Sequence, residues 1–149
     1  MTALVFRLEL PLGLAPSLNV YASWKPWQRA NLRAQLLAEV SQAALGYPRC
    51  HLGIVRGPTR RKGMPGPVIV EGNARRRRVV VMRYSSTQPD EVSADSIGGK
   101  CPIDVLVRVG ILRDDNAKWC EREARWERAA PGAGRVVIEV HEIETETAT

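Results

Sequence analysis

The sequence predicts an α+β domain with one mixed sheet of about four to six strands, covered by two main helices. Three observations support this prediction. Segments with strand and helix patterns follow one another in the order strand, helix, strands, helix, strands. Apolar residues make up 44% of the chain, which is enough for a packed core. The length of 149 residues suits one domain, and we expect residues 1–149 to form a single unit.

The first part of the chain predicts a strand followed by a helix. Residues 1–10 contain the alternating run ALVFRLEL, which is typical of a half-buried strand. Residues 15–27, APSLNVYASWKPW, have the composition of a loop. Residues 26–45 have apolar side chains spaced near 3.6, which predicts a basic amphipathic helix. Pro26 suits its first turn, and Gly46 suits its end.

The middle of the chain predicts a loop and two strands. Residues 57–67, GPTRRKGMPGP, combine three prolines, three glycines and three bases, so we expect a flexible basic loop. Residues 68–72 and 77–86 are predicted strands on either side of a turn at Gly72–Asn73. The continuous apolar run in the second of these is typical of a central strand.

The second half begins with a polar, acidic loop at residues 85–99, followed by a helix at 100–110. Pro102 is tolerated only in a first turn, so this helix must begin close before it. Gly110 suits its carboxyl-terminal cap.

Residues 118–143 are expected to form the terminal strands. The segments 119–128 and 135–143 both have strand composition, and AAPGAG joins them. We therefore expect these two strands to pair with each other.

Basic residues concentrate between positions 56 and 83, where nine lysines and arginines stand against one acid. The net charge of this segment is +8. Because the net charge of the whole chain is +6, the remaining residues sum to −2. Such a cluster is typical of a polyanion-binding surface, although a solvated surface would also explain it. The expected DNA contacts are Arg60, Arg61, Lys62, Arg75, Arg76, Arg77 and Arg78. Because the last four lead into a strand, alternation should send about half of them to the other face, where salt bridges are the default.

The cysteines and the hydropathy indicate the compartment. The three cysteines are far apart and form no motif of paired thiols, which favours a reducing, cytoplasmic setting. No apolar run has membrane-spanning length, and the chain begins without a basic segment leading into an apolar one. We expect no membrane partner and no small-molecule cofactor.

The helix at 100–110 has a polar face whose residues could take part in catalysis. Lys100 and Asp104 are four residues apart and share this face, and Asp114 and Asp115 follow shortly after the helix. Converging carboxylates are what Mg²⁺ requires, and a lysine beside them can neutralise a phosphate. A solvated helix end would give the same pattern.

A family resemblance favours the chemical interpretation. The frame K-x-x-x-D-x-L/V-x-x-x-G-x-x-x-D-D resembles the signature of RusA-type Holliday junction resolvases, crossover junction endodeoxyribonucleases. It is formed here by Lys100, Asp104, Gly110, Asp114 and Asp115. The stretch PSLNVY resembles the P-S-x-N segment near the start of those proteins. The phage- and prophage-encoded branch is similar in further positions, which here are Gly98, Gly99 and Trp119.

The resemblance implies an intertwined homodimer that cuts four-way DNA junctions with Mg²⁺, or with Mn²⁺ in its place. It implies that Lys100 is the catalytic lysine and that Asp115 is a catalytic metal ligand, with Asp104 and Asp114 as further acidic positions. The family usually carries D-x-D-N before the lysine, whereas this chain reads PDEVSADSIGGK. Asp95 is the best counterpart there, as a catalytic and metal-binding residue, and Asp90 with Glu91 could substitute from a shifted loop.

Two alternatives remain open at the level of sequence. A chain that keeps the basic surface but has too few carboxylates would be an inactive branched-DNA-binding protein of the same family. A chain with a merely solvated acidic loop would be a structural or partner-binding protein. Tyr21, Trp24 and Trp27 could stack on unpaired bases, or they could anchor the start of a helix to the core.

Overall fold

A computed structural model describes residues 2–50, 76–112, 117 and 120–143. The predicted loop 57–67 and the predicted strand 68–72 lie outside these residues, as does the turn at Gly72–Asn73. Among the described residues, no helix combines the length and the apolar character needed to cross a membrane.

One mixed four-stranded sheet forms the centre of the fold, in the order β1-β4-β2-β3. Its strands are β1 (Thr2–Pro11), β2 (Arg77–Ser85), β3 (Cys120–Arg128) and β4 (Arg135–Ile143). β4 is antiparallel to both β1 and β2, whereas β2 and β3 are parallel. The predicted α+β class, the mixed sheet and the central position of β2 are therefore confirmed.

The predicted pairing of the last two strands is wrong, because β2 lies between them. Val81 at the middle of β2 is opposite Ala124 on β3 and opposite Ile138 on β4. The connecting loop crosses the end of β2, where the Ala129 N–H donates to the Ser85 carbonyl at 3.0 Å. Adjacent strands are about 4.8 Å apart, so a six-residue connection spans two strand spacings easily.

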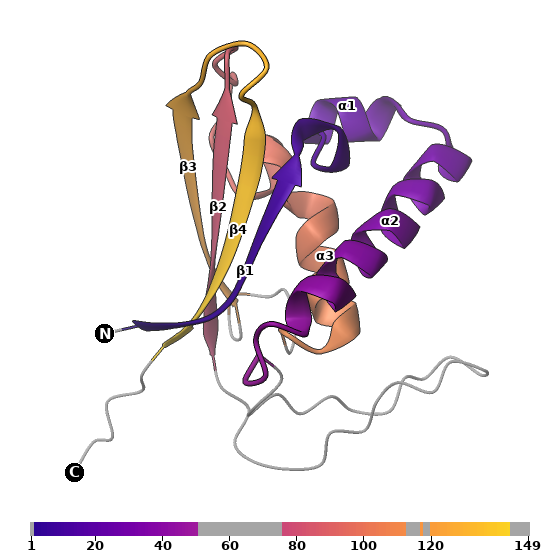
Figure 1. Ribbon diagram of the computed structural model, residues 1–149. Coiled ribbons are helices and arrows are strands. Elements are labelled where there is room, and N and C mark those ends of the chain that lie inside the picture. Colours follow the sequence, from indigo (N-terminus) through magenta and orange to yellow (C-terminus); the bar gives the residue numbers. More distant parts are fainter. Residues whose placement is uncertain (1, 51–75, 113–116, 118–119, 144–149) are drawn as a thin grey trace.

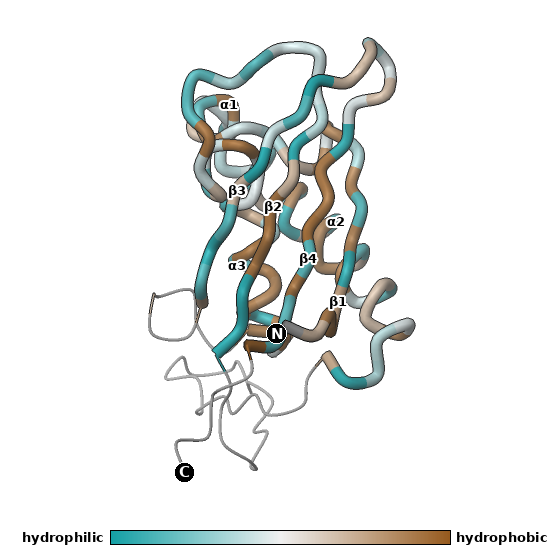
Figure 2. Tube along the Cα trace, turned by 90° about the vertical axis from the view of Figure 1, so that its left-hand side faces the viewer, coloured by the Kyte–Doolittle hydropathy of each residue, from teal (hydrophilic) through white to brown (hydrophobic). Residues whose placement is uncertain are grey.

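Helices α1 (Leu18–Ser23), α2 (Pro26–Ala44) and α3 (Lys100–Val109) lie on one side of the sheet (Figure 1). Figure 2 shows the strands toward the viewer with the helices behind them. The helices predicted at 26–45 and 100–110 are confirmed, and Gly110 ends α3 with the expected left-handed backbone, φ 86°.

Helix α1 was not predicted, since its sequence has loop composition. The Ser17 side chain makes no capping hydrogen bond at its amino end, but its carboxyl end is held by a residue of the next helix. Arg29 donates from Nε to the Tyr21 carbonyl at 3.2 Å and from Nη2 to the Ala22 carbonyl at 2.7 Å. The Arg29 guanidinium also lies 5.4 Å from the centre of the Tyr21 ring. A cation at the carboxyl end of a helix satisfies its last carbonyls, so α1 depends on a partner that local sequence rules do not consider.

The core lies between the helices and the sheet. Phe6 of β1, Val81 of β2 and Ile138 of β4 are fully buried there, together with Leu36 of α2 and Leu106 of α3. Alternation along the strands sends the intervening side chains to the opposite face, which no helix covers in Figure 2.

The uncovered face carries many paired charges. Arg7 lies 3.7 Å from Glu139, and Arg125 lies 3.0 Å from Glu123. Among the described residues, acids and bases therefore alternate on this face.

Candidate functional site

Helix α3 presents the predicted lysine and aspartate on its exposed face. The Lys100 Nζ lies 3.7 Å from Asp104 Oδ1, and the two side chains are 42% and 46% exposed. The opposite face of α3 buries Cys101, Ile103 and Leu106. Exposed ion pairs contribute about 0–1 kcal/mol, so this pair can exchange partners at little cost.

The five residues before α3 form a π-helical turn, η2 (Asp95–Gly99), where the sequence predicted the end of an acidic loop. Gly98 has φ 112°, a conformation that favours glycine. A Cβ at Gly98 would lie 2.6 Å from the Ala15 carbonyl oxygen, and a Cβ at Gly99 would overlap the Ala94 carbonyl. The two glycines therefore let the backbone before Lys100 approach its neighbours closely, which fixes where α3 begins.

Arg83 of β2 donates hydrogen bonds to this turn and to the segment before α1. Its Nη1 donates to the Ala15 carbonyl at 2.9 Å and to the Ile97 carbonyl at 3.2 Å. Burial lowers the pKa of the Arg83 guanidinium below its ordinary value. Arg83 thus connects the segment before α1 to the turn before α3. In the sequence it is distinguished only as one of several basic residues.

Asp95 lies at the start of η2 and is paired with a residue of the edge strand β3. Its Oδ1 lies 2.9 Å from Arg122 Nη1, and the side chains are 36% and 29% exposed. Both residues line a hollow of about 310 Å³, together with Val92 and Ala124. The pairing joins positions 27 apart in the chain, so no local sequence pattern could indicate it.

Hydrogen bonds between serines order the acidic loop. The Ser93 N–H donates to Ser96 Oγ at 2.9 Å, and the Ser96 N–H donates to Ser93 Oγ at 3.2 Å. Ser96 stands where the resemblance would place asparagine. A separate hollow of about 340 Å³ is lined by Ser17 and Asn19 together with Asp90 and Glu91. The PSLN stretch therefore lies beside the acidic loop, a juxtaposition that the sequence did not reveal.

The predicted metal ligands are placed only in part. Asp95 and Asp104 each have a cationic partner, whereas Asp114 and Asp115 lie outside the described residues. Within residues 2–50, 76–112, 117 and 120–143, no three or more His, Cys, Asp or Glu side chains are grouped to hold a metal ion.

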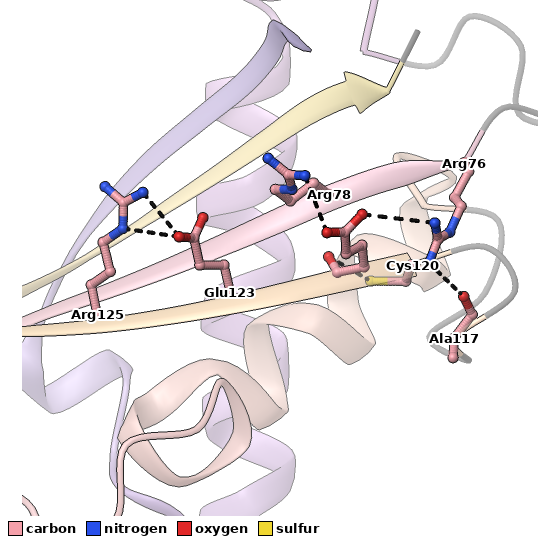
Figure 3. A network of polar contacts seen from close by, with 7 residues as sticks. Arg76, Arg78, Ala117, Cys120, Glu123 and Arg125 are labelled. Carbon is pink, nitrogen blue, oxygen red and sulfur yellow. Dashed lines mark hydrogen bonds and ion pairs between the residues drawn. The ribbon is translucent and has the colours of Figure 1, made fainter. Parts of the chain in front are cut away.

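Part of the predicted DNA-binding set is also placed. Arg60, Arg61, Lys62 and Arg75 lie outside the described residues. Arg76 and Arg78 approach the same carboxylate, with Nη atoms 3.7 Å and 3.1 Å from Glu121 (Figure 3). Arg76 also donates to the Ala117 carbonyl at 3.2 Å. Both side chains keep exposed surface, so both can still reach a phosphate.

Arg77 corrects the sequence prediction, because its side chain is fully buried. Its Nη1 donates to the Ile111 carbonyl at 2.8 Å and to the Cys50 carbonyl, and its Nη2 lies 3.8 Å from Glu142. A side chain without exposed surface cannot reach a DNA phosphate, so the predicted contact of Arg77 with DNA is wrong. The expected alternation and the expected salt bridges are both observed in this run.

Arg33 of α2 is a basic residue near α3 that sequence analysis did not single out. The Tyr21 hydroxyl and the Cys101 thiol share a hydrogen bond, and burial is the main cause that raises the pKa of each. The positive charge of Arg33 lowers the pKa of both groups and so opposes the effect of burial. The charge of Lys100 does the same at Cys101, which indicates that Arg33, like Lys100, lies near the start of α3. The spacing of four between Arg29 and Arg33 could have indicated their common helical face.

No protein-family model matches the chain, and no curated protein matches its sequence significantly.

Proposed function

We propose that the protein is a structure-selective DNA endonuclease that cuts four-way junctions by Mg²⁺-dependent phosphodiester hydrolysis, as RusA-type resolvases do. The observation that carries the proposal is the exposed Lys100–Asp104 pair on α3, directly after a turn that begins with the half-exposed Asp95. An ammonium group and carboxylates on adjoining elements are the groups that such a reaction requires.

Each residue has a definite part in this proposal. Asp95, Asp104, Asp114 and Asp115 supply the hard oxygen ligands that Mg²⁺ prefers. Bound there, the ion would polarise the phosphate and lower the pKa of an attacking water. Lys100 neutralises charge on the scissile phosphate, because its exposed side chain can exchange Asp104 for a phosphate oxygen.

DNA binding is assigned to a revised basic set. Arg33 joins it because its charge acts on the Cys101 thiol, next to Lys100 in the chain, and Arg77 leaves it because it is buried. The set becomes Arg33, Arg60, Arg61, Lys62, Arg75, Arg76 and Arg78. In this proposal the protein works as a homodimer, since a two-fold protein suits a junction with near two-fold symmetry. We also propose a cytoplasmic location.

A second candidate function is a catalytically weak or inactive branched-DNA-binding protein of the same family. It is favoured by the Arg122 guanidinium, which lies 2.9 Å from the Asp95 carboxylate that Mg²⁺ would need. It is also favoured by the missing D-x-D-N motif in the acidic loop.

A cleavage assay on a labelled four-way junction separates the two functions. We expect nicks at opposed strands with Mg²⁺ or Mn²⁺ and none with EDTA. Asp115→Asn should abolish cleavage and leave binding unchanged, because it removes a ligand charge and leaves the basic surface intact. Lys100→Ala should lower the cleavage rate more than the affinity. Glu39→Gln, an exposed substitution on α2, is the control and should change neither.

Two outcomes contradict the endonuclease, and one contradicts the assignment of its site. Tight, salt-sensitive junction binding without nicking under either ion would favour the inactive relative. Full cleavage by Asp115→Asn would remove that residue from the site. No DNA affinity at low salt would exclude both functions and favour a structural or partner-binding protein.

A further inference from the structure

A hollow between the segment before α1 and the first half of α2 is separate from the candidate catalytic residues. It has a volume of about 230 Å³ and is lined by Gly13, Trp24, Trp27, Gln28, Asn31 and Gln35, with Leu32 at its base. Gly13 belongs to the 3-10 turn η1 (Leu12–Leu14), and the others belong to α2 or precede it directly.

The two indoles of the hollow differ in environment. Trp24 is partly buried against the core and lies 6.2 Å from the Tyr21 ring, centre to centre. Trp27 is 66% exposed, which leaves most of its surface available. A single exposed aromatic needs no explanation, but this one borders a hollow that has a second indole in its wall. The alternative that these aromatics merely anchor the helix therefore accounts for Trp24 and leaves Trp27 unexplained.

The polar groups of the hollow are also available. Asn31 and Gln35 are four residues apart on α2, and neither side-chain amide has a hydrogen-bond partner within the part of the chain that the structure describes. Gln28 is held in place, because its Oε1 accepts from the Lys25 N–H at 2.8 Å. An amide offers both donors and an acceptor, and such groups pair with the edges of nucleobases.

From these observations we infer that the hollow binds an unpaired DNA base, which stacks on Trp27 while the Asn31 and Gln35 amides contact its edge. The inference rests on the proposed function for its choice of DNA as the partner. No acidic side chain of the described residues lines the hollow, so a base can enter without bringing its phosphate near one of their carboxylates. The exposed Lys25 next to it can face that phosphate.

In this inference the hollow acts in the selection of the DNA substrate and not in its cleavage. If a base pair opens at the point of exchange, a stacking site for the freed base would favour that point over continuous duplex. Stacking on an aromatic side chain tolerates any base, so we expect this site to select for DNA structure more than for sequence.

The test compares a fluorescently labelled oligothymidine with an abasic strand of the same length and charge, using the full-length protein at low salt. The wild type should bind the strand with bases more tightly. Trp27→Ala should weaken that binding about fivefold or more and leave the abasic strand unaffected, which removes the preference. Trp27→Phe should keep most of the preference, since it retains an aromatic face.

Matched amide variants refine the test. Asn31→Ala and Gln35→Ala should each reduce the preference for bases. Gln42→Ala, the same substitution on the same helix outside the hollow, should not. Circular dichroism must show that each variant is folded, which is expected for an exposed residue such as Trp27.

The inference is overturned if Trp27→Ala keeps the wild-type preference for bases. It is also overturned if Trp27→Ala changes the oligomeric state in sedimentation, which would make the hollow a contact between copies, or if the hollow binds a proline-rich peptide in place of DNA. Junction cleavage with no preference for bases would remove this inference and leave the proposed function intact. A preference for bases without cleavage would remove the endonuclease and leave the base site.

Discussion

Replacing Arg77 with methionine tests whether this residue belongs to the core, as its full burial indicates, or to a DNA-binding surface. Methionine keeps most of the aliphatic volume and removes the guanidinium. The carbonyls of Cys50 and Ile111 would lose their charged donor, and Glu142 would lose a cation.

The expected loss of stability follows from these contacts. A buried acceptor that loses its donor costs about 1–3 kcal/mol, and two carbonyls are affected here. Glu142 is partly exposed, so its lost partner adds at most about 1 kcal/mol. The free energy of unfolding should therefore fall by about 2–7 kcal/mol. With a slope of about 2 kcal/mol/M, the urea midpoint should fall by about 1–3.5 M.

Urea denaturation followed by circular dichroism measures this loss, and Arg78→Met is the matched control. Arg78 is the next residue on the same strand, but it is one-third exposed and pairs with Glu121 at 3.1 Å. Its replacement should lower the free energy of unfolding by about 0–1 kcal/mol. Equal and small losses in the two variants would refute the structural role of Arg77. So would a loss of junction affinity in a stable Arg77→Met protein.

Three further predictions follow from the same kind of contact. Gly98→Ala should lower the free energy of unfolding by about 1–3 kcal/mol, because alanine at φ 112° is strained and its Cβ would meet the Ala15 carbonyl oxygen. Thermal denaturation would measure this loss, and an unchanged midpoint would contradict the prediction. Arg83→Met should destabilise the fold by about 2–3 kcal/mol in urea and lower the cleavage rate, with partial rescue by lysine. Burial raises the pKa of the Cys50 and Cys101 thiols above 9.0, so the folded chain favours their neutral forms. Stability should be full below pH 9 and should decline as the pH rises above it; a Cys101→Ala variant should show a weaker decline.

The sequence predicted those elements that local rules control. Residues 26–45 have the spacing and the terminal signals of a helix, and residues 77–86 have the apolar run of a central strand; both are observed. Helix α1 was missed because its stabilising contacts come from Arg29 on the next helix. The pairing of the last two strands was predicted wrongly, because loop length cannot tell whether a neighbour or a more distant strand is the partner.

The candidate site shows the same division. The Lys100–Asp104 pair is local, and the spacing of four predicted it. The partner of Asp95 could not be predicted, since Arg122 belongs to an edge strand that the fold brings beside η2. Within the arginine run, alternation predicted that about half would turn inward, but the choice of Arg77 required the register of β2 against β4.

An acidic side chain that is paired with a cation can still bind a metal ion. Whether it can do so depends on how deeply the pair is buried. Asp95 and Asp104 are both more than one-third exposed, so leaving Arg122 and Lys100 costs each of them about 0–1 kcal/mol. A divalent ion with further carboxylate ligands can exceed that cost, and the displaced Lys100 would then be available to a phosphate oxygen. Arg77 cannot make such an exchange, because its guanidinium has no exposed surface. The half-exposed ion pairs are therefore compatible with a metal site that forms together with the DNA complex, whereas the buried arginine belongs to the fold.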